Sequence, residues 1–173
     1  MPQQIEREAF EVITVNSECR VITSENLRVV YEPASYLPEV VRRRYGLRDS
    51  SHVLELHFPN IIQAPVDALT PEHKTGSFRQ FFEWLAQNSN SLFPLWEAIV
   101  GITNRGMAGG AKLLGFDIAE IEESDIDPGR LEKIRQGYEQ TRRFQEKGLP
   151  MGGIFVCYYP FERFIARFNG HRS

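Results

Sequence analysis

The sequence predicts a mixed α/β domain (α/β or α+β), and three observations support this prediction. Segments with the patterns of strands and of helices alternate along much of the chain. Apolar residues make up 42% of the chain and include twelve Phe, which is enough for a sizeable core and excludes disorder as the main state. The length of 173 residues is typical of one domain, so we expect a single domain over residues 1–173.

Composition and charge exclude several classes of protein. The net charge of −3 argues against a partner that is a nucleic acid. No apolar run reaches the roughly 18 residues of a spanning helix, and the N-terminus lacks the apolar core of a signal peptide. The two cysteines and four histidines show no metal-binding spacing. We therefore expect a cytoplasmic protein without nucleic acid, membrane or metal, and the oligomeric state stays open.

The N-terminal residues predict three strands in an antiparallel meander. Phe10–Val15 and Cys19–Thr23 alternate between apolar and polar residues, and residues 16–18 between them are typical of a turn. A second turn at residues 24–26 leads into the third strand, Leu27–Tyr31.

The spacing next predicts a helix over residues 35–45, because its apolar side chains fall on one helical face: Leu37, Val40, Val41 and Tyr45. Ser35 can cap this helix, which places Pro38 in the first turn, where proline is tolerated. Gly46 ends it.

The middle of the chain predicts strand, loop, helix and strand. Val53–Phe58 is a short strand, and residues 59–76 form a long irregular stretch with three prolines, of a length that is often functional. Ser77 caps a helix that ends near Asn88. A strand of the buried type follows at Trp96–Thr103.

The remaining pattern predicts five further elements. They are a short helix at Asn104–Leu114, a strand at Asp117–Ile121, a helix from Asp127-Pro128 to about Lys147, a strand at Gly153–Tyr159, and helical turns within Phe161–Ser173.

One segment is more informative than the rest. A buried strand runs through Asn104 into a glycine-rich helix, and Gly115-Phe116 then opens the next strand. Glycines at such a junction allow close approach by a backbone or a ligand, and free N–H groups at a helix start favour an anion. A tight packing turn without a ligand is the alternative.

This segment resembles the GNAT superfamily of acyltransferases, in which an Asn precedes Gly-Phe by eleven residues, as Asn104 precedes Gly115 here. Ile102–Met107 also resembles the corresponding turn of the acyl-homoserine-lactone synthase branch. The resemblance implies a GNAT-like mixed, twisted sheet flanked by helices. It also implies transfer of an acyl group from an acyl-CoA or acyl carrier protein thioester to an amine.

The resemblance also implies a loop that holds the phosphates of the acyl carrier by backbone N–H groups. Its place here is residues 73–78, where Lys74, Gly76 and Ser77 would bind the phosphates and Asn104 would shape the cofactor cleft. A second register of the loop pattern falls on residues 105–110.

Acyl transfer to an amine needs a proton acceptor and a donor for the developing negative charge. Glu55 and His57 lie two residues apart on one side of the predicted strand and form a candidate acceptor pair; surface positions are the alternative. Tyr158 is a candidate acid, and a core or edge aromatic is its alternative. Cys157 is a candidate nucleophile or a buried structural thiol.

Two other functions stay open at this point. A non-catalytic binding module would keep the fold with its cofactor cleft filled, for instance by Phe78, and would act through a protein or small-molecule partner. A small enzyme of unrelated fold would use residues 59–76 as a lid over its site.

Overall fold

A computed structural model describes residues 10–16, 19–23, 28–57, 79–88, 96–139 and 142–169. These residues contain a seven-stranded sheet in the order β1-β2-β3-β4-β5-β7-β6. Its strands are β1 (Glu11–Thr14), β2 (Arg20–Thr23), β3 (Arg28–Pro33), β4 (His52–His57), β5 (Trp96–Asn104), β6 (Asp117–Ile121) and β7 (Ile154–Pro160).

The sheet is mixed, because one pair of neighbouring strands is parallel. β4 and β5 run parallel, whereas every other pair is antiparallel. Parallel neighbours require a crossover connection, and helical residues 79–88 lie in the chain between these two strands. This mixed sheet with flanking helices confirms the predicted fold class.

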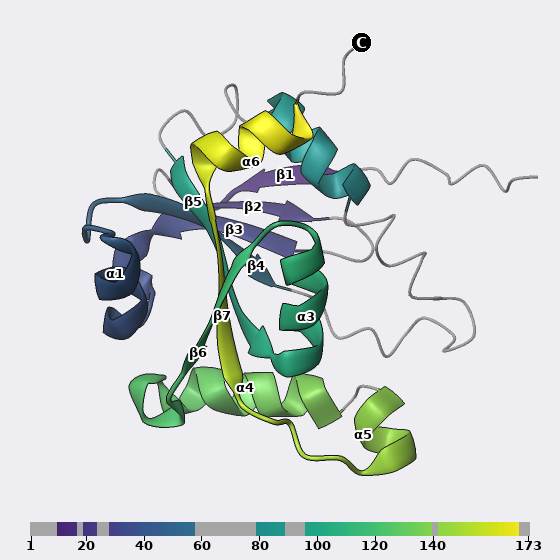
Figure 1. The fold of residues 1–173 in the computed structure, drawn as a ribbon. Coiled ribbons are helices and arrows are strands. Elements are labelled where there is room, and N and C mark those ends of the chain that lie inside the picture. Colours follow the sequence, from purple (N-terminus) through teal and green to yellow (C-terminus); the bar gives the residue numbers. More distant parts are fainter. Residues whose placement is uncertain are drawn as a thin grey trace, which may run out of the picture.

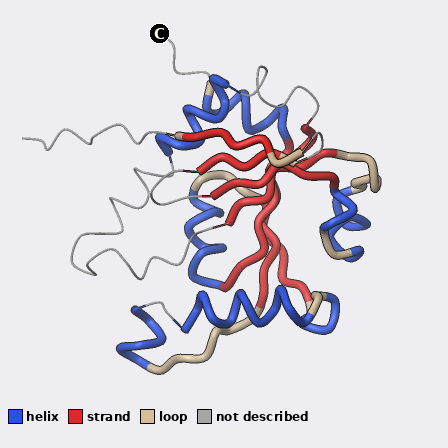
Figure 2. The backbone as a smooth tube through the Cα atoms, turned by 180° about the vertical axis from the view of Figure 1, so that it is seen from behind, coloured by secondary structure: helices blue, strands red, loops and turns tan. Residues whose placement is uncertain are grey.

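Helices cover both faces of the sheet (Figures 1 and 2). The described helices, besides residues 79–88, are α1 (Glu39–Tyr45), α3 (Arg105–Leu113), α4 (Pro128–Glu139), α5 (Arg142–Lys147) and α6 (Phe161–Phe168). Side chains of residues 79–88, α3 and α6 join one buried cluster, and side chains of α1 and α4 join or pack against another. The sheet separates the two clusters.

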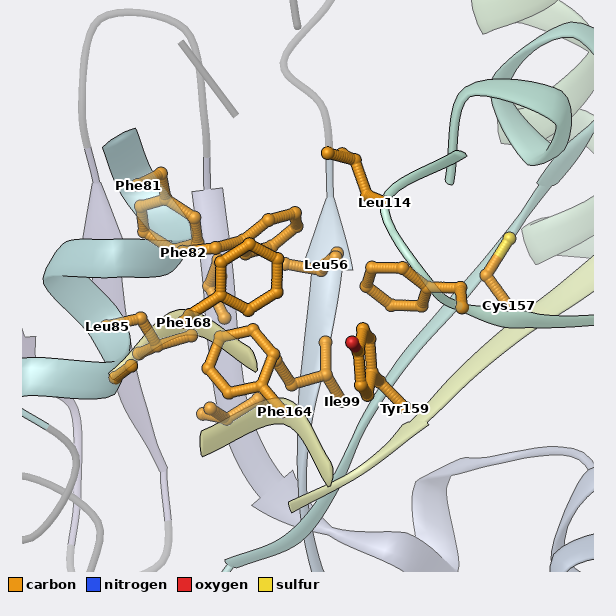
Figure 3. Packing of buried hydrophobic residues seen from close by; sticks show 14 of the residues in the cluster. Leu56, Phe81, Phe82, Leu85, Ile99, Leu114, Cys157, Tyr159, Phe164 and Phe168 are labelled. Atoms are coloured by element: carbon orange, nitrogen blue, oxygen red, sulfur yellow. The ribbon is translucent and has the colours of Figure 1, made fainter. Parts of the chain in front are cut away.

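Aromatic rings dominate the first of these clusters (Figure 3). The ring of Phe82 lies 5.7 Å from Phe116, 5.7 Å from Phe164 and 5.3 Å from Phe168 between centroids. Tyr159 meets Phe164 edge-on at 5.4 Å. Such tilted and edge-to-face pairs add to the stabilisation from burial alone, so this face uses much of the chain's phenylalanine content.

The second cluster is aliphatic and contains small side chains such as Ala98, Val100 and Val156. Among the described residues, three polar or charged side chains are buried: Ser51, Glu55 and Asn104. Glu55 lies on a strand of this sheet, and a buried charge requires a partner. The partner of this charge lies in the candidate site.

The helix predicted over residues 35–45 is wrong at its start. A single 3-10 turn covers Ala34–Tyr36, and α1 begins only at Glu39. Leu37 is extended, with ψ of 151°, because a residue before proline avoids the helical region. Pro38 therefore stands at the N-cap position rather than inside the first turn, and the exposed Ser35 caps no α-helix.

The other predicted elements agree with the structure to within a few residues, and β6 agrees at both ends. Asn104 ends β5 instead of beginning the helix, which it caps. The helix predicted from residue 128 to 147 is described as α4 and α5, with residues 140–141 outside the description. The predicted turn at 24–26 and the stretch 59–76 also lie outside the described residues.

Candidate functional site

The candidate site is centred on Glu55, which β4 carries on the face of the sheet below α1 and α4. Side chains alternate along a strand, so Val53, Glu55 and His57 share this face, while Leu54 and Leu56 enter the aromatic cluster. Glu55 is only 2% exposed. The structure therefore contradicts the alternative that Glu55 is a surface residue.

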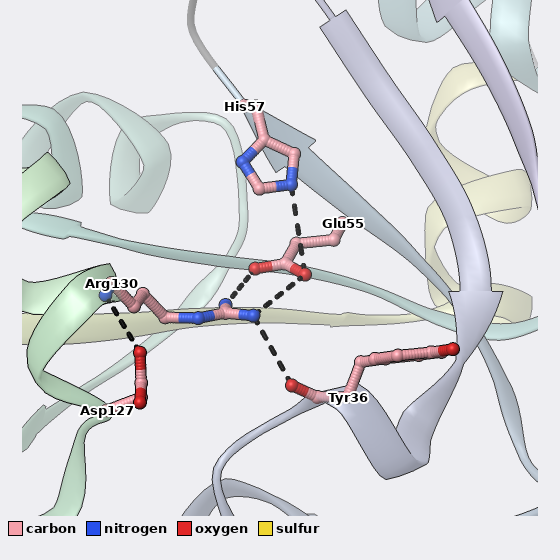
Figure 4. Close-up of polar contacts among 5 residues, drawn as sticks. All are labelled: Tyr36, Glu55, His57, Asp127 and Arg130. Carbon is pink, nitrogen blue, oxygen red and sulfur yellow. Dashed lines mark hydrogen bonds and ion pairs between the residues drawn. The ribbon is translucent and has the colours of Figure 1, made fainter.

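Arg130 of α4 is the partner of the Glu55 carboxylate (Figure 4). Its Nη1 donates to Glu55 Oε1, and its Nη2 lies 3.5 Å from Oε2 and 3.3 Å from the carbonyl oxygen of Tyr36. The backbone N–H of Arg130 donates to Asp127 Oδ2 over 3.1 Å. The predicted helix start at Asp127-Pro128 thus positions Arg130 over the sheet.

His57 lies on the more open side of Glu55. Its Nε2 is 3.8 Å from Glu55 Oε2, and its side chain is 45% exposed. Partial burial is the main cause that lowers the pKa of His57 below 6.5. Glu55 opposes this shift, whereas Arg130, Arg28 and Lys133 add to it. At neutral pH the imidazole is therefore uncharged and able to accept a proton.

Glu32 of β3 brings a second carboxyl group to Glu55. Glu32 pairs with Val53 across the β3–β4 ladder, so its side chain shares the face of Glu55. Burial raises the pKa of Glu32 to about 8, with further increases from hydrogen bonding to Glu55 and from its charge. Glu32 is therefore mostly protonated at neutral pH.

The site lies where the pairing of the two parallel strands ends. The register of β4 with β5 runs as far as Glu55 and Val100, while β4 continues to His57 and β5 to Asn104. The acyltransferase hypothesis requires parallel strands that part beside residues 99–104, and this requirement stays a prediction. Just beyond the last pair the strands are still close, since a Cβ at Gly101 would lie 3.9 Å from Leu56 Cβ. Residues 74–78, on the other side of the expected cleft, lie outside the described residues.

Tyr158 shares the face of Glu55 but does not contact it. Val100 pairs with Glu55 on one side and with Tyr158 on the other, so two strand spacings of roughly 4.8 Å separate the two residues. The ring of Tyr158 stacks on Tyr45 of α1 at 3.9 Å between centroids. Burial is the main cause that raises the pKa of Tyr158, so its hydroxyl keeps its proton at neutral pH.

Of the four predicted cofactor-binding residues, the structure describes Asn104. Asn104 is 7% exposed, and its Oδ1 accepts a hydrogen bond from the Met107 backbone N–H over 3.1 Å. This bond caps α3 and fixes the chain at the end of β5. Lys74, Gly76 and Ser77 lie outside the described residues, as does Phe78, and their roles stay predictions.

The structure favours the structural alternative for Cys157. This residue is buried in the aromatic cluster, and burial raises the pKa of its thiol to about 12. A thiol that stays protonated is a poor nucleophile, so Cys157 is not expected to react.

Sequence reasoning missed Arg130 and Glu32. Arg130 is 75 residues from Glu55, and the basic residues of its helix are typical of a solvated face. One indication of Arg130 was present in the sequence. The helix start at Asp127-Pro128 places Arg130 in the first turn of that helix and so limits the direction of its side chain. Glu32 could have been found only from the strand register.

The described residues contain no group of three or more His, Cys, Asp or Glu side chains that could hold a metal ion. None of the helices in the described ranges combines the length and the apolar character of a membrane span.

No family model matches the chain, and no curated protein matches it. Two solved structures are similar to it. An uncharacterized protein (bh2621) from Bacillus halodurans has a TM-score of 0.43 and 12% identity, covering 90% of this chain and 65% of its own. The AHL synthase LasI has a TM-score of 0.41 and 12% identity, covering 95% of this chain and 81% of its own. The chain thus spans less than two thirds of the first of these proteins, and neither likeness assigns an activity.

Proposed function

We propose that this chain is an N-acyltransferase that moves an acyl group from an acyl-CoA or acyl carrier protein thioester to an amine. The observation that carries the proposal is the place of His57 beside the buried Glu55, at the point where the pairing of β4 with β5 ends. In this proposal the two strands part beyond that point and leave room for an extended donor, and a neutral imidazole accepts a proton from the attacking amine.

In this reaction the amine nitrogen attacks the thioester carbonyl carbon, and its proton passes to His57. The C–S bond then breaks, and the thiolate takes a proton from Tyr158 or from water. The Glu55 carboxylate, 3.8 Å from the His57 ring, stabilises the imidazolium that forms. The ion pair with Arg130 fixes the Glu55 side chain for this task.

The donor lies, in this proposal, between the parted strands. Lys74 and the backbone N–H groups of Gly76 and Ser77 bind its phosphates, and Asn104 shapes the cleft at the end of β5. Acyl-CoA and acyl carrier protein present the same phosphopantetheine thioester, so both remain in the donor class.

The second candidate function is a binding module without catalysis. Two observations favour it. Both oxygens of the Glu55 carboxylate already face Arg130, and the Asn104 side chain is already used as a helix cap. Such a site could hold a small molecule or a protein partner and leave it unchanged.

Ligand binding and thiol release together separate the two functions. Thermal unfolding is measured with acetyl-CoA, a long-chain acyl-CoA and an acylated carrier protein. A ligand at about 100 times its Kd adds about 2.7 kcal/mol, or a rise in Tm of roughly 5–10 °C. Release of free thiol is then followed with a panel of amines.

The matched variants are His57→Gln and His52→Gln, which change the two histidines of β4. His52 stacks on Tyr31, at 5.0 Å between centroids, at the far end of the strand. We expect His57→Gln to lower the rate of thiol release about 100-fold or more and His52→Gln to leave it near the wild-type rate. A Tm shift without thiol release supports the binding module, and no response to any donor overturns the acyltransferase proposal.

A further inference from the structure

Arg28 of β3 is the direct neighbour of His57 of β4 on the face of the sheet below α4. The two residues are partners in the β3–β4 ladder, and partners in an antiparallel pair share a face, with Cβ atoms about 4.5–5.5 Å apart. Because β3 and β5 flank β4 on its two sides, Arg28 borders His57 on the side away from β5. The proposed function places the donor between β4 and β5, so Arg28 lies on the side that is left for the acceptor.

α4 carries a second cation on the same flank as Arg130. Lys133 follows Arg130 by three residues, and residues three apart on a helix are neighbours on one side of it. Arg130 reaches Glu55 (Figure 4), so this flank of α4 faces β4. Arg135 lies on another side of the helix, where it pairs with Glu123. Lys133, unlike Arg135, therefore lies on the flank that faces the site.

Arg28 and Lys133 have no counterion among the described residues. Both are exposed, and neither forms an ion pair or a side-chain hydrogen bond with another described residue. Glu11 lies in the same row of side chains, but Thr23 of β2 stands between it and Arg28. Glu32 is mostly uncharged at neutral pH, because burial raises its pKa to about 8. A bound anion therefore meets two cations without displacing an existing ion pair, and hydrogen bonds between charged groups are the strong ones.

The charges around His57 agree with this placement. Partial burial is the main cause that lowers the pKa of His57, Glu55 opposes the shift, and the charges of Arg130, Arg28 and Lys133 add to it. The Glu55 carboxylate compensates Arg130 through their ion pair. The positive charge of Arg28 and Lys133 is therefore in excess beside the imidazole.

We propose that Arg28 and Lys133 form an anion subsite beside His57, and that the acceptor amine of the proposed reaction carries a carboxylate or a phosphate group. The subsite follows from the placement of the two cations, whereas the acceptor's part rests on the proposed function. The acceptor nitrogen has to reach His57 for its proton to pass, so an anionic group held next to that imidazole belongs to the acceptor. Arg28 and Lys133 bind and orient the acceptor and take no proton.

Imidazole NMR titrations test the placement of the two cations without any assay of activity. The signal of His57 is identified by its absence in His57→Gln. Arg28→Gln and Lys133→Gln should each raise the midpoint of the His57 titration, because each removes a positive charge that disfavours the imidazolium. Arg135→Gln is the matched control on α4, and the His57 midpoint should stay at its wild-type value in this variant.

Two pairs of amines test the subsite and identify its anion. Phenylalanine is compared with phenylalanine amide, and phosphoethanolamine with ethanolamine, since the members of each pair differ in the anionic group. Binding is followed by the His57 signal at low ionic strength, where charge interactions are least screened. We expect the anionic member of at least one pair to bind about tenfold more tightly than its partner, with this preference reduced by Arg28→Gln or Lys133→Gln and kept by Arg135→Gln. The pair that responds distinguishes a carboxylate from a phosphate.

The outcomes separate this proposal from the proposed function. An unchanged His57 titration in both Arg28→Gln and Lys133→Gln overturns the placement, and a lack of preference within both pairs of amines overturns the subsite. Preferred binding of an anionic amine, without thiol release from any donor, supports the subsite and contradicts the acyltransferase function. Thiol release at equal rates with the anionic and the neutral amines supports the function and contradicts the subsite.

Discussion

Arg130 and Glu55, 75 residues apart in the sequence, form an ion pair that ties α4 to the central strand β4. The Glu55 side chain is 3% exposed and that of Arg130 is 25% exposed. The Arg130 guanidinium therefore compensates the buried charge of Glu55. The side of Glu55 that faces His57 remains the open side of the site.

Loss of either partner should destabilise the protein more than loss of both. Arg130→Met leaves an unpaired buried carboxylate, and we expect it to lower the free energy of unfolding by about 2–4 kcal/mol. In the double variant with Arg130→Met and Glu55→Leu, the loss in free energy of unfolding should be smaller, because no buried charge remains unpaired. Urea unfolding followed by tryptophan fluorescence measures all variants.

The control for this comparison is Arg135→Met. Arg135 pairs with Glu123 at 2.8 Å, but both side chains are about half exposed, so the expected cost is about 0–1 kcal/mol. Equal costs for Arg130→Met and Arg135→Met would mean that the Glu55 pair is solvated.

The Glu32 proton should make stability depend on pH in a defined direction. Its ordinary pKa is 4.5 and its pKa in the folded protein is about 8. Between these values the folded state binds more protons than the unfolded state, so the stability contributed by Glu32 is full below about pH 4.5 and is lost as pH rises through 8.

Glu32→Gln removes this dependence, so the variant should gain stability relative to the wild type between about pH 5 and about pH 9. Because the Glu32 carboxyl is partly open to water, screening limits the expected gain to about 1–2 kcal/mol. Thermal unfolding over this range measures it, with Glu97→Gln as the control, because the Glu97 side chain is 43% exposed. A constant difference between Glu32→Gln and wild type would show that Glu32 ionises normally.

The parts of this protein that sequence could predict are those encoded by neighbouring residues. The local sequence predicted β6 at both ends, and the Asp127-Pro128 pair predicted the start of α4, because neighbouring residues decide both. Glu55 and His57 were predicted as a pair for the same reason, since a strand places residues two apart on one face. Arg130 was not predicted as part of the site, because its contact depends on how α4 crosses the sheet.

The early break of the helix near Pro38 shows a different limit. The apolar spacing from Leu37 to Tyr45 is helical, but the backbone before a proline resists the helical region. The apolar spacing favoured a helix from residue 35, whereas the steric effect of Pro38 on Leu37 disfavoured it. The steric effect decided where α1 begins. Periodicity predicts that a helix exists more reliably than it predicts the helix's first residue.

The two cysteines should react at very different rates in the folded protein. With a pKa of about 12 for Cys157, about one thiol in ten thousand is ionised near pH 8, and the side chain is buried. In a Cys19→Ala variant, which leaves only Cys157, labelling by a thiol reagent should be slow until denaturant is added. Fast labelling of the folded variant would restore Cys157 as a candidate nucleophile.

Gly115, the glycine of the Gly-Phe motif, should tolerate no side chain, for reasons of packing alone. Its φ is +103°, a conformation that other residues rarely adopt. A Cβ there would lie 2.5 Å from Arg167 Nη1 and 2.7 Å from Tyr159 Oη. The arginine can move away, but Tyr159 is 1% exposed and held among the aromatic rings. We expect Gly115→Ala to cost about 2–4 kcal/mol in urea unfolding.

Gly109→Ala is the matched control, because this glycine lies inside α3 and a Cβ there would meet nothing within 4 Å. Alanine is the better helix former, so this variant should be more stable than wild type by about 0.5–1 kcal/mol. Opposite signs for the two variants would show that conformation and the contact with Tyr159 require glycine at position 115. A Gly115→Ala variant as stable as wild type would leave that glycine without a structural reason and would favour a ligand that needs close approach to the backbone there.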